Sequence, residues 1–448
     1  MKKLIFLTLQ ILILIIIVLW VISSNQKVDF FWKGIIFTSN ASFFISILIF
    51  LVVVALIIQR IYLYFRQTPK RIKDNLKINK YKKGINSIVK AIAALSNNDD
   101  RELIAQSKRI ENYLEDNPIN LIIKAEAARK KKQFALAEEN YNKMLTNPDI
   151  KIIGLKGLLE QNLRTQDYHH ALIYAEQIYQ INSKLDWIYE TILQIIIKTK
   201  NWQKLIEINN DAKSKKIISK FLQNKSNAVA LYEISLIKEG VSIEESIKLL
   251  EQAINFRPNF PPFIKKIVSL LIENNQISKA KKILFKAWSN DPHPSYFDEI
   301  MILSEKEGNK IEKIVNELIR TNSQNYESII VKIKAKIIEK NFDEAKKIIS
   351  PLLSSRPNKT ICELMSKVEM GISGNLSKAN SWLGRANFGN YEKTWVCKNT
   401  GLYQKEWTSI TKEGHFDSLE WIIPNNDIND SGLKKMSNFI PNIIGTNT

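Results

Sequence analysis

The chain has 448 residues, of which 45% are hydrophobic, with only 14 glycines, 12 prolines and two cysteines. This composition excludes a disordered chain, a collagen-like chain and a fold held together by disulfides. The net charge of +20 suggests nucleic acid or an anionic membrane as a partner. Residues 1–90 hold 14 basic and two acidic residues, a net +12. Most of the excess is therefore local to the N-terminal part, and nucleic acid is not expected as a partner.

The first apolar stretch, Leu4 to Ile22, carries no charge. At about 1.5 Å per residue it is long enough to cross the hydrocarbon core of a bilayer as a helix. A cleaved signal peptide is the alternative, because Lys2 and Lys3 precede the apolar run. The residues at 21–24 make a poor cleavage site, and the run is longer than a signal peptide needs. A spanning helix is therefore predicted.

A second uncharged stretch runs from Gly34 to Gln59 and predicts a second span. Residues 1–66 are thus expected to form a transmembrane hairpin, with spans at about 4–22 and 41–59 and a short loop between them. Residues 60–90 carry ten basic residues and one acidic residue, so the positive-inside rule places both termini in the cytoplasm. A basic juxtamembrane segment, 67–90, is expected to contact lipid headgroups. The basic residues predicted to set the topology are Arg60, Arg66, Lys70, Arg71 and Lys73.

The segment 91–385 has helical spacing of apolar residues and no alternating strand-like runs, so it is predicted to be all-α. An aromatic or apolar residue followed three positions later by a small or apolar one recurs at nine places. The second members lie at 103, 137, 171, 205, 246, 280, 314, 345 and 379. Six of the eight spacings are 34 residues, the tetratricopeptide period. The fold predicted is a tetratricopeptide-like α-solenoid that follows two transmembrane helices.

In each predicted pair of helices the small residue allows close approach, and the aromatic residue fills the gap between neighbouring pairs. Stacked pairs form a concave groove that holds protein partners. The exposed face of each first helix should line that groove, for instance around Lys124, Glu126 and Arg129. The predicted repeat-packing residues are Phe134, Ala137, Tyr168, Ala171, Trp202, Ala280, Phe342 and Ala345.

Residues 386–424 are rich in tryptophan and turn glycines, which predicts a small β-hairpin element that caps the solenoid, followed by a flexible tail at 425–448. The cap resembles a degenerate zinc ribbon, but a ribbon needs four ligands in two close pairs. Only Cys397 is present, and Thr400 stands where its partner would be, so no metal is predicted and Cys397 is a weak candidate ligand. The predicted cap residues are Trp395, Gly401, Trp407, Phe416 and Trp421.

No motif brings together an acid, a base and a nucleophile, and the sequence contains no phosphate-binding or dinucleotide-binding glycine loop. The four histidines, His169, His170, His293 and His415, form no ligand pattern. The chain is therefore not expected to be an enzyme, and no cofactor is predicted.

The tail pattern from Trp395 to Trp421, W-x-C-x2-T-G…W…G-x-F-D-S-L-E-W, closes the chain. Together with the two spans, the basic stretch at 67–72, the segment 83–95 and the helical repeats, it resembles the bacterial HemY family, most closely its alphaproteobacterial branch. The resemblance implies a multi-pass inner-membrane protein linked to a late stage of protohaem synthesis, with no established catalytic activity. The tail is also similar to the rubredoxin-like metal ribbon of the LapB scaffold family.

These features predict a scaffold at the inner membrane, with its soluble part in the cytoplasm, that gathers protein partners of late haem synthesis in its groove. One alternative is a haem- or porphyrin-binding module, for which Cys397 and scattered histidines are the available axial ligands. Another is an envelope-assembly or proteolysis adaptor of the LapB type.

Overall fold

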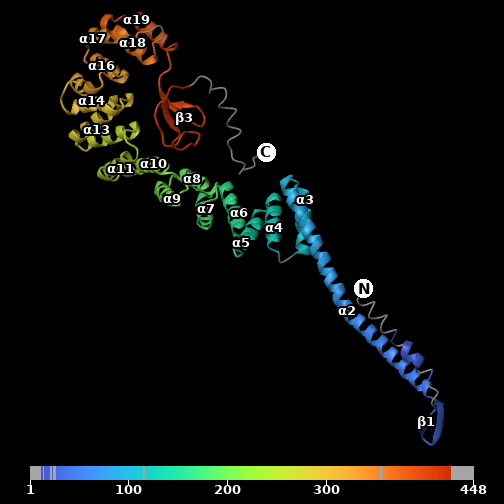
Figure 1. The fold of residues 1–448 in the computed structure, drawn as a ribbon. Helices are drawn as coiled ribbons and strands as arrows, with labels where there is room; N and C mark the ends of the chain where they lie inside the picture. Colours follow the sequence, from blue (N-terminus) through green and yellow to red (C-terminus); the bar gives the residue numbers. More distant parts are fainter. Residues whose placement is uncertain are drawn as a thin grey trace. The chain divides into compact units, whose positions relative to one another are not determined.

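The computed structural model is mostly helical, which confirms that part of the prediction (Figure 1). The chain divides into two compact units, Met1–Asn140 and Tyr141–Thr448. The predicted tail at 425–448 lies outside the described residues, as does much of the predicted first span at about 4–22. The residues that the structure describes are 12–13, 15–20, 23, 27–114, 117–353 and 357–424.

A β-hairpin stands where the sequence predicted a loop between the spans. Strand β1 (Lys27–Trp32) pairs antiparallel with β2 (Ile35–Asn40). The two residues between them, Lys33 and Gly34, both have positive φ angles, 45° and 83°. Such a turn matches the right-handed twist of the flanking strands, and the aromatic and β-branched residues on either side favour extended backbone. The all-α prediction is therefore wrong for this segment.

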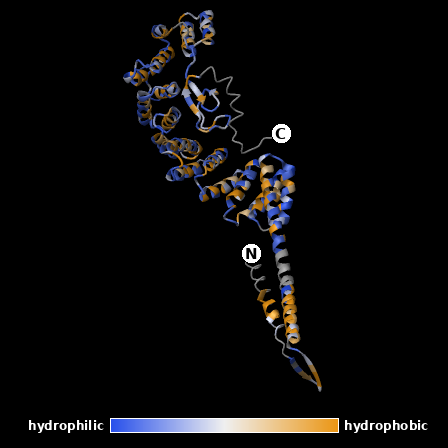
Figure 2. Cartoon of the chain, turned by 45° about the vertical axis from the view of Figure 1, so that its right-hand side comes forward, coloured by the Kyte–Doolittle hydropathy of each residue, from blue (hydrophilic) through white to orange (hydrophobic). Residues whose placement is uncertain are grey.

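Helix α2 (Ala41–Ser96) is one continuous helix of 56 residues. Its segment Ser42–Tyr62 is long and apolar enough to cross a membrane, and it is the one such segment in the described part of the chain. Figure 2 shows hydrophobic residues along this part of the helix. Two spans were predicted, and the structure describes one candidate. The helix continues without a break through the segment 67–90, which the sequence had separated from the first repeat.

The end of α2 packs on α3 (Asp100–Tyr113) and supplies the core of the first unit. Ala91 and Leu103 are buried at this contact, and α4 (Pro118–Lys130) adds Ile123. The C-terminal part of α2 therefore serves as the first helix of the first helical pair.

The second helix of each pair begins at a predicted position. These helices are α3, α5, α7, α9, α11, α13, α15, α17 and α19, and their first residues are 34, 34, 34, 41, 34, 34, 31 and 34 positions apart. The spacing of 41 arises because α10 has 20 residues, several more than its counterparts. The helices that follow α4 are α5 (Phe134–Met144), α6 (Lys151–Arg164), α7 (Tyr168–Ile181), α8 (Ile188–Thr199), α9 (Trp202–Ser214), α10 (Lys220–Glu239), α11 (Ile243–Phe256), α12 (Pro261–Glu273), α13 (Ile277–Asn290), α14 (Phe297–Lys306), α15 (Ile311–Leu318), α16 (Tyr326–Ile338), α17 (Phe342–Ile349), α18 (Lys359–Ser373) and α19 (Leu376–Ala386). Single 3-10 turns η1 (Pro294–Tyr296), η2 (Ile319–Thr321) and η3 (Ser350–Leu352) adjoin α14, α15 and α17.

The turns between paired helices share one backbone device. A residue with positive φ lies two positions before the second helix, where the left-handed conformation ends the first helix. The next residue then caps the second helix in several pairs, as Asp99 and Asn201 do through their side-chain oxygens. The left-handed residues at this position are Asn98, Lys132, Gln166, Lys200, Asn275, Lys340 and Gly374.

The C-terminal module, residues 394–422, is a three-stranded antiparallel sheet with its connecting loops. Its strands β3 (Thr394–Cys397), β4 (Tyr403–Gln404) and β5 (Leu419–Ile422) lie in the order β4-β3-β5. The module lies on the inner side of the arc of helices from α9 to α18 (Figure 1). The sequence predicted a cap on the end of the solenoid, and the structure corrects this position.

Candidate functional site

An aromatic cluster holds the C-terminal module against the helices. The Trp407 ring meets Phe260 and Phe263 of the α12 region edge-on, with ring centroids 5.2 and 5.9 Å apart. It also meets Tyr232 of α10 at 5.4 Å. Aromatic side chains bury large apolar areas, and edge-to-face pairs add further stabilisation. The tryptophans of the module are therefore buried by the helices of the second unit rather than by the small sheet alone.

An ion pair reinforces this contact. Asp417 has a side chain that is only 7% exposed, and it accepts a hydrogen bond from Arg257 over 2.9 Å. The second carboxylate oxygen lies 3.2 Å from the Lys225 Nζ atom. Two cations thus compensate one buried carboxylate. Without them the buried charge would be strongly destabilising. The loop that carries Asp417 is fixed to both α10 and the end of α11.

The Cys397 side chain is buried within its own module. Its Sγ atom lies 3.3 Å from the Ser418 Oγ atom, and the residue is 1% exposed. Desolvation would raise the pKa of the thiol, but hydrogen bonds from Ser418 and Thr400 outweigh it and lower that pKa. Among the residues that the structure describes, no group of three or more His, Cys, Asp or Glu side chains is placed to hold a metal ion. The Cys397 sulfur is thus buried beside the Ser418 hydroxyl group within its own module.

A groove of 970 Å³ separates the C-terminal module from the inner faces of α12, α16 and α18. One wall is β5 and the residues after it, and the other is made by the beginnings of the helices. Because proline and asparagine residues start these helices, polar backbone and side-chain groups gather at this end of each helix. The residues that line the groove include Arg257, His293, Tyr326, Glu327, Lys334, Glu392, Lys393, Trp395, Leu419, Glu420, Trp421 and Ile423.

Two half-buried charges face the groove from α16. Burial raises the pKa of Glu327 to about 7, and burial lowers the pKa of Lys334. The Lys334 Nζ atom lies 4.6 Å from the centre of the Phe297 ring and pairs with no carboxylate among the described residues. By contrast, Glu392 accepts hydrogen bonds from the Thr360 N–H and hydroxyl groups at 3.1 and 3.0 Å. Lys334 is thus a half-buried cation of the groove wall that has no ion-pair partner among the described residues.

His293 lies beneath the groove against the tryptophans of the module. Its ring centre is 4.5 Å from that of Trp421, and its Nδ1 atom is 2.7 Å from the Ser295 Oγ atom. Burial lowers the pKa of His293 to about 4, so the ring is neutral at pH 7. The contacts with Trp421 and Trp395 indicate a packing role for this ring.

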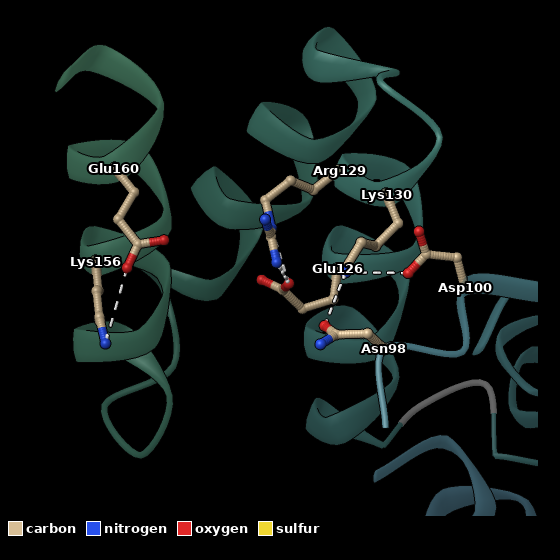
Figure 3. Close-up of polar contacts among 7 residues, drawn as sticks. All are labelled: Asn98, Asp100, Glu126, Arg129, Lys130, Lys156 and Glu160. Atoms are coloured by element: carbon tan, nitrogen blue, oxygen red, sulfur yellow. Dashed lines mark hydrogen bonds and ion pairs between the residues drawn. The ribbon is translucent and has the colours of Figure 1, made fainter. Parts of the chain in front are cut away.

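The groove residues predicted on α4 pair along the helix surface (Figure 3). Arg129 donates to Glu126 over 2.6 Å, and Lys124 lies 2.8 Å from Glu111 of α3. The same figure shows Lys130 paired with Asp100 at 3.0 Å. These pairs are solvated and connect neighbouring turns and helices, so the charges at Lys124, Glu126 and Arg129 are engaged within the first unit.

The predicted repeat-packing residues occupy the interfaces between helices. Trp202 is 3% exposed, Phe134, Tyr168 and Phe342 are half-buried, and Phe342 lies against Gly371 of α18, where a larger residue would overlap its ring. The fully buried small members are Ala137, Ala171, Ala280 and Ala345.

The other predicted residues are divided between the two units. In the module, Trp395 and Trp407 are buried, Phe416 and Trp421 are half-buried, and Gly401 has a φ of 74°. In α2, Arg60 and Lys73 are exposed, whereas the side chains of Arg66, Lys70 and Arg71 lie outside the description.

Sequence reasoning missed the residues that shape the groove. Arg257 and Asp417 come together from positions 160 residues apart, so no local pattern links them. Lys334 is one lysine among many on the helices. One signal was available for Asp417, which lies inside the conspicuous G-x-F-D-S pattern of the tail.

No family model matches the chain, and no curated protein matches it. One chain in the structure of Naa15/Naa10 bound to HypK-THB matches with 13% identity and a TM-score of 0.39. The match covers 72% of this chain and 54% of that chain. It thus spans about half the length of that protein. A tetratricopeptide repeat protein from Parabacteroides merdae ATCC 43184 matches with 13% identity, 56% of this chain, 93% of that chain and a TM-score of 0.28. YrrB, a TPR protein with an unusual peptide-binding site, matches with 12% identity, 44% of this chain, 99% of that chain and a TM-score of 0.24. The helix spacing of the chain itself carries the assignment of a tetratricopeptide-like repeat.

Proposed function

We propose that the chain is a membrane-bound scaffold that holds a segment of a partner protein in the groove between α16 and the C-terminal module. The observation that carries the proposal is the groove itself, 970 Å³ in volume and lined by aromatic, polar and charged side chains. Repeat solenoids use such concave surfaces to bind proteins. The apolar segment Ser42–Tyr62 supports the membrane attachment by its length and composition.

The partners that we propose are enzymes of late haem synthesis at the bacterial inner membrane, which the resemblance to the HemY family suggests. Two enzymes held by one scaffold would experience an effective local concentration in the millimolar range, roughly that of a short flexible link. Porphyrins are large and apolar, so a short transfer distance would limit their loss to the membrane. The scaffold would contribute proximity and no chemistry of its own.

Crosslinking of the full chain in native membranes, followed by mass spectrometry, tests this proposal. Crosslinks between groove residues such as Lys393 and a haem-synthesis enzyme would support it. Crosslinks to a membrane protease or a lipopolysaccharide enzyme would instead support the adaptor alternative. If groove lysines gave no intermolecular crosslinks while surface lysines such as Lys412 did, the groove would not be the binding site.

The membrane attachment needs a separate measurement. Alkaline carbonate extraction should leave the chain in the pellet, and a reporter fused after Lys90 should be active only in the cytoplasm. Replacing Leu51 and Val52, both exposed on the apolar segment, with aspartate should release the chain or abolish its insertion, because charges in the hydrocarbon core cost about 3 kcal/mol each. Recovery of the unmodified chain in the soluble fraction would contradict the attachment.

A further inference from the structure

Strand β5 is an unpaired edge of the module's sheet, and it borders the groove. Just after β3 the Lys398 N–H donates to the Ser418 carbonyl over 2.8 Å, and the N–H of Cys397, the last residue of β3, donates to the Leu402 carbonyl over 2.8 Å. Backbone groups alternate in direction along a strand, so Ser418 and its alternate residues point toward β3. The N–H and C=O groups of Leu419 and Trp421 therefore point away from β3.

These outward groups have no partner in the rest of the described chain. The turn and loop hydrogen bonds of the described residues include none from Leu419 or Trp421. The same alternation, continued by one residue, directs the N–H of Ile423 to the same edge. Leu419, Trp421 and Ile423 all line the groove, so the edge faces a cavity instead of open solvent. An unpaired edge is a template for one more strand.

The opposite wall of the groove supplies a charged contact. Lys334 is half-buried on α16 and pairs with no described carboxylate, whereas Arg257 is already paired with Asp417. Glu420 on β5 is likewise paired with Lys398, at 2.6 Å. An incoming segment would therefore meet a free backbone edge on one side and, on the other, a half-buried cation that forms no ion pair with a described residue. A cation half removed from water gains most from a carboxylate.

We infer that the groove binds an extended segment of a partner protein as a fourth strand on β5, with an acidic side chain of that segment paired to Lys334. The inference rests on the proposed function and specifies how the same groove recognises its partner. Backbone pairing would supply affinity for any extended segment, and Lys334 would select an acidic one. Two to three residues on the segment would pair with the outward groups, which fits the short length of β5.

A photo-crosslinking residue at the groove tests the inference in the full chain, in native membranes. Tyr326, an exposed aromatic residue of the groove, is replaced by p-benzoylphenylalanine. As a matched control, the same replacement is made at Tyr403 on the opposite edge strand β4. We expect an adduct with a partner protein from position 326, and several-fold less of it from position 403. The adducted peptide, identified by mass spectrometry, should be extended and acidic in composition.

A pair of variants isolates the backbone contact. Ile423→Pro removes the outward N–H, whereas Ile423→Ala removes more of the exposed side chain and keeps the N–H. The loss of one backbone hydrogen bond is worth about 1 kcal/mol, so Ile423→Pro should reduce the adduct about five-fold and Ile423→Ala much less. Lys334→Met should also reduce the adduct, and Lys334→Arg should retain it. Tryptophan fluorescence of each variant reports whether the module is still docked.

Three outcomes would overturn the inference. If Ile423→Pro and Ile423→Ala gave equal adduct yields, and Lys334→Met did not change the yield, a partner would bind in the groove without strand pairing. The proposed function would then stand. An adduct with residues 425–448 of the same chain would show that the occupant is intramolecular. If neither position 326 nor any groove lysine captured a partner, the proposed function would fail together with the inference.

Discussion

Arg257 and Asp417, which are 160 residues apart in the sequence, form an ion pair of 2.9 Å that joins the C-terminal module to the end of α11. Asp417 has a φ of 44°, a conformation that asparagine adopts as readily as aspartate. Asp417→Asn therefore removes the charge without straining the backbone. It leaves Arg257 and Lys225 without their carboxylate, so we expect a loss of about 2 kcal/mol in the free energy of unfolding.

Urea unfolding of the detergent-solubilised chain, followed by tryptophan fluorescence, measures this loss. Glu420→Gln is the control, because Glu420 pairs with Lys398 at a site where both side chains are about half exposed. Exposed pairs contribute at most about 1 kcal/mol. If the two variants changed the unfolding free energy equally, the Arg257–Asp417 pair would not be important for holding the module.

Trp407 should be the largest single contributor to docking of the module. Trp407→Ala opens a cavity among Tyr232, Phe260 and Phe263, and we expect it to cost about 3 to 5 kcal/mol. Trp407→Phe should cost much less, because the indole Nε1 atom is buried without a hydrogen-bond partner among the described residues. Removing an unsatisfied polar atom offsets part of the lost packing.

Limited proteolysis distinguishes undocking of the module from general unfolding. Trp407→Ala should expose cleavage sites within 394–422 while the helices stay protected. Phe388→Ala, at a residue that is 82% exposed, should behave like the unmodified chain. Equal protection of the module in all three proteins would show that other contacts suffice to hold it.

The repeat was predictable because its cause is local. Every pair of helices needs a small or apolar residue at one fixed place, so Ala137 and Ala171 recur at the spacing of the fold and are fully buried. The position of the C-terminal module was not predictable, because it depends on how far the arc of helices curves back. Its aromatic residues indicate burial, but they do not indicate which of the many apolar helix faces buries them.

The groove and the N-terminal hairpin were missed for different reasons. The groove depends on Lys334 and β5, which approach each other only after the module docks. The hairpin was missed because its residues, such as Phe37, were assigned to a short loop between two predicted spans, and neither six-residue strand alternates regularly between apolar and polar residues.

Lys200→Gly should stabilise the chain. Lys200 ends α8 in the left-handed conformation, with φ 54° and ψ 31°, and its side chain is exposed. A side chain in this conformation costs about 1 kcal/mol relative to glycine, so the unfolding free energy should rise by up to that amount. Lys198→Gly, inside the same helix, should instead lower it by about 1 kcal/mol. Thermal or urea unfolding that gave both variants the same sign would contradict the role of the turn.

Glu299 should make the stability of the chain depend on pH. It is 4% exposed in the first turn of α14, and its Oε2 atom has no hydrogen-bond partner among the described residues. Burial raises the pKa of Glu299 to about 7, against a partial opposing effect of Lys265. The folded chain therefore binds this proton more tightly than the unfolded chain, whose carboxyl titrates near 4.5. Stability from this group is present below pH 4.5 and is lost as the pH rises through 7.

The neutral variant Glu299→Gln removes that loss. It should exceed the unmodified chain in unfolding free energy by about 3 kcal/mol at pH 8, and by no more than about 1 kcal/mol at pH 5. His293 changes stability in the opposite direction, because burial lowers its pKa to about 4 and stability falls as the pH drops from 6.5 toward that value. Comparing the two proteins at each pH cancels this contribution, since both contain His293.

Glu305→Gln, exposed on the same helix, should give the same difference at both values of pH. A Glu299→Gln difference that did not grow between pH 5 and pH 8 would mean that the carboxyl of Glu299 reaches water in the folded chain.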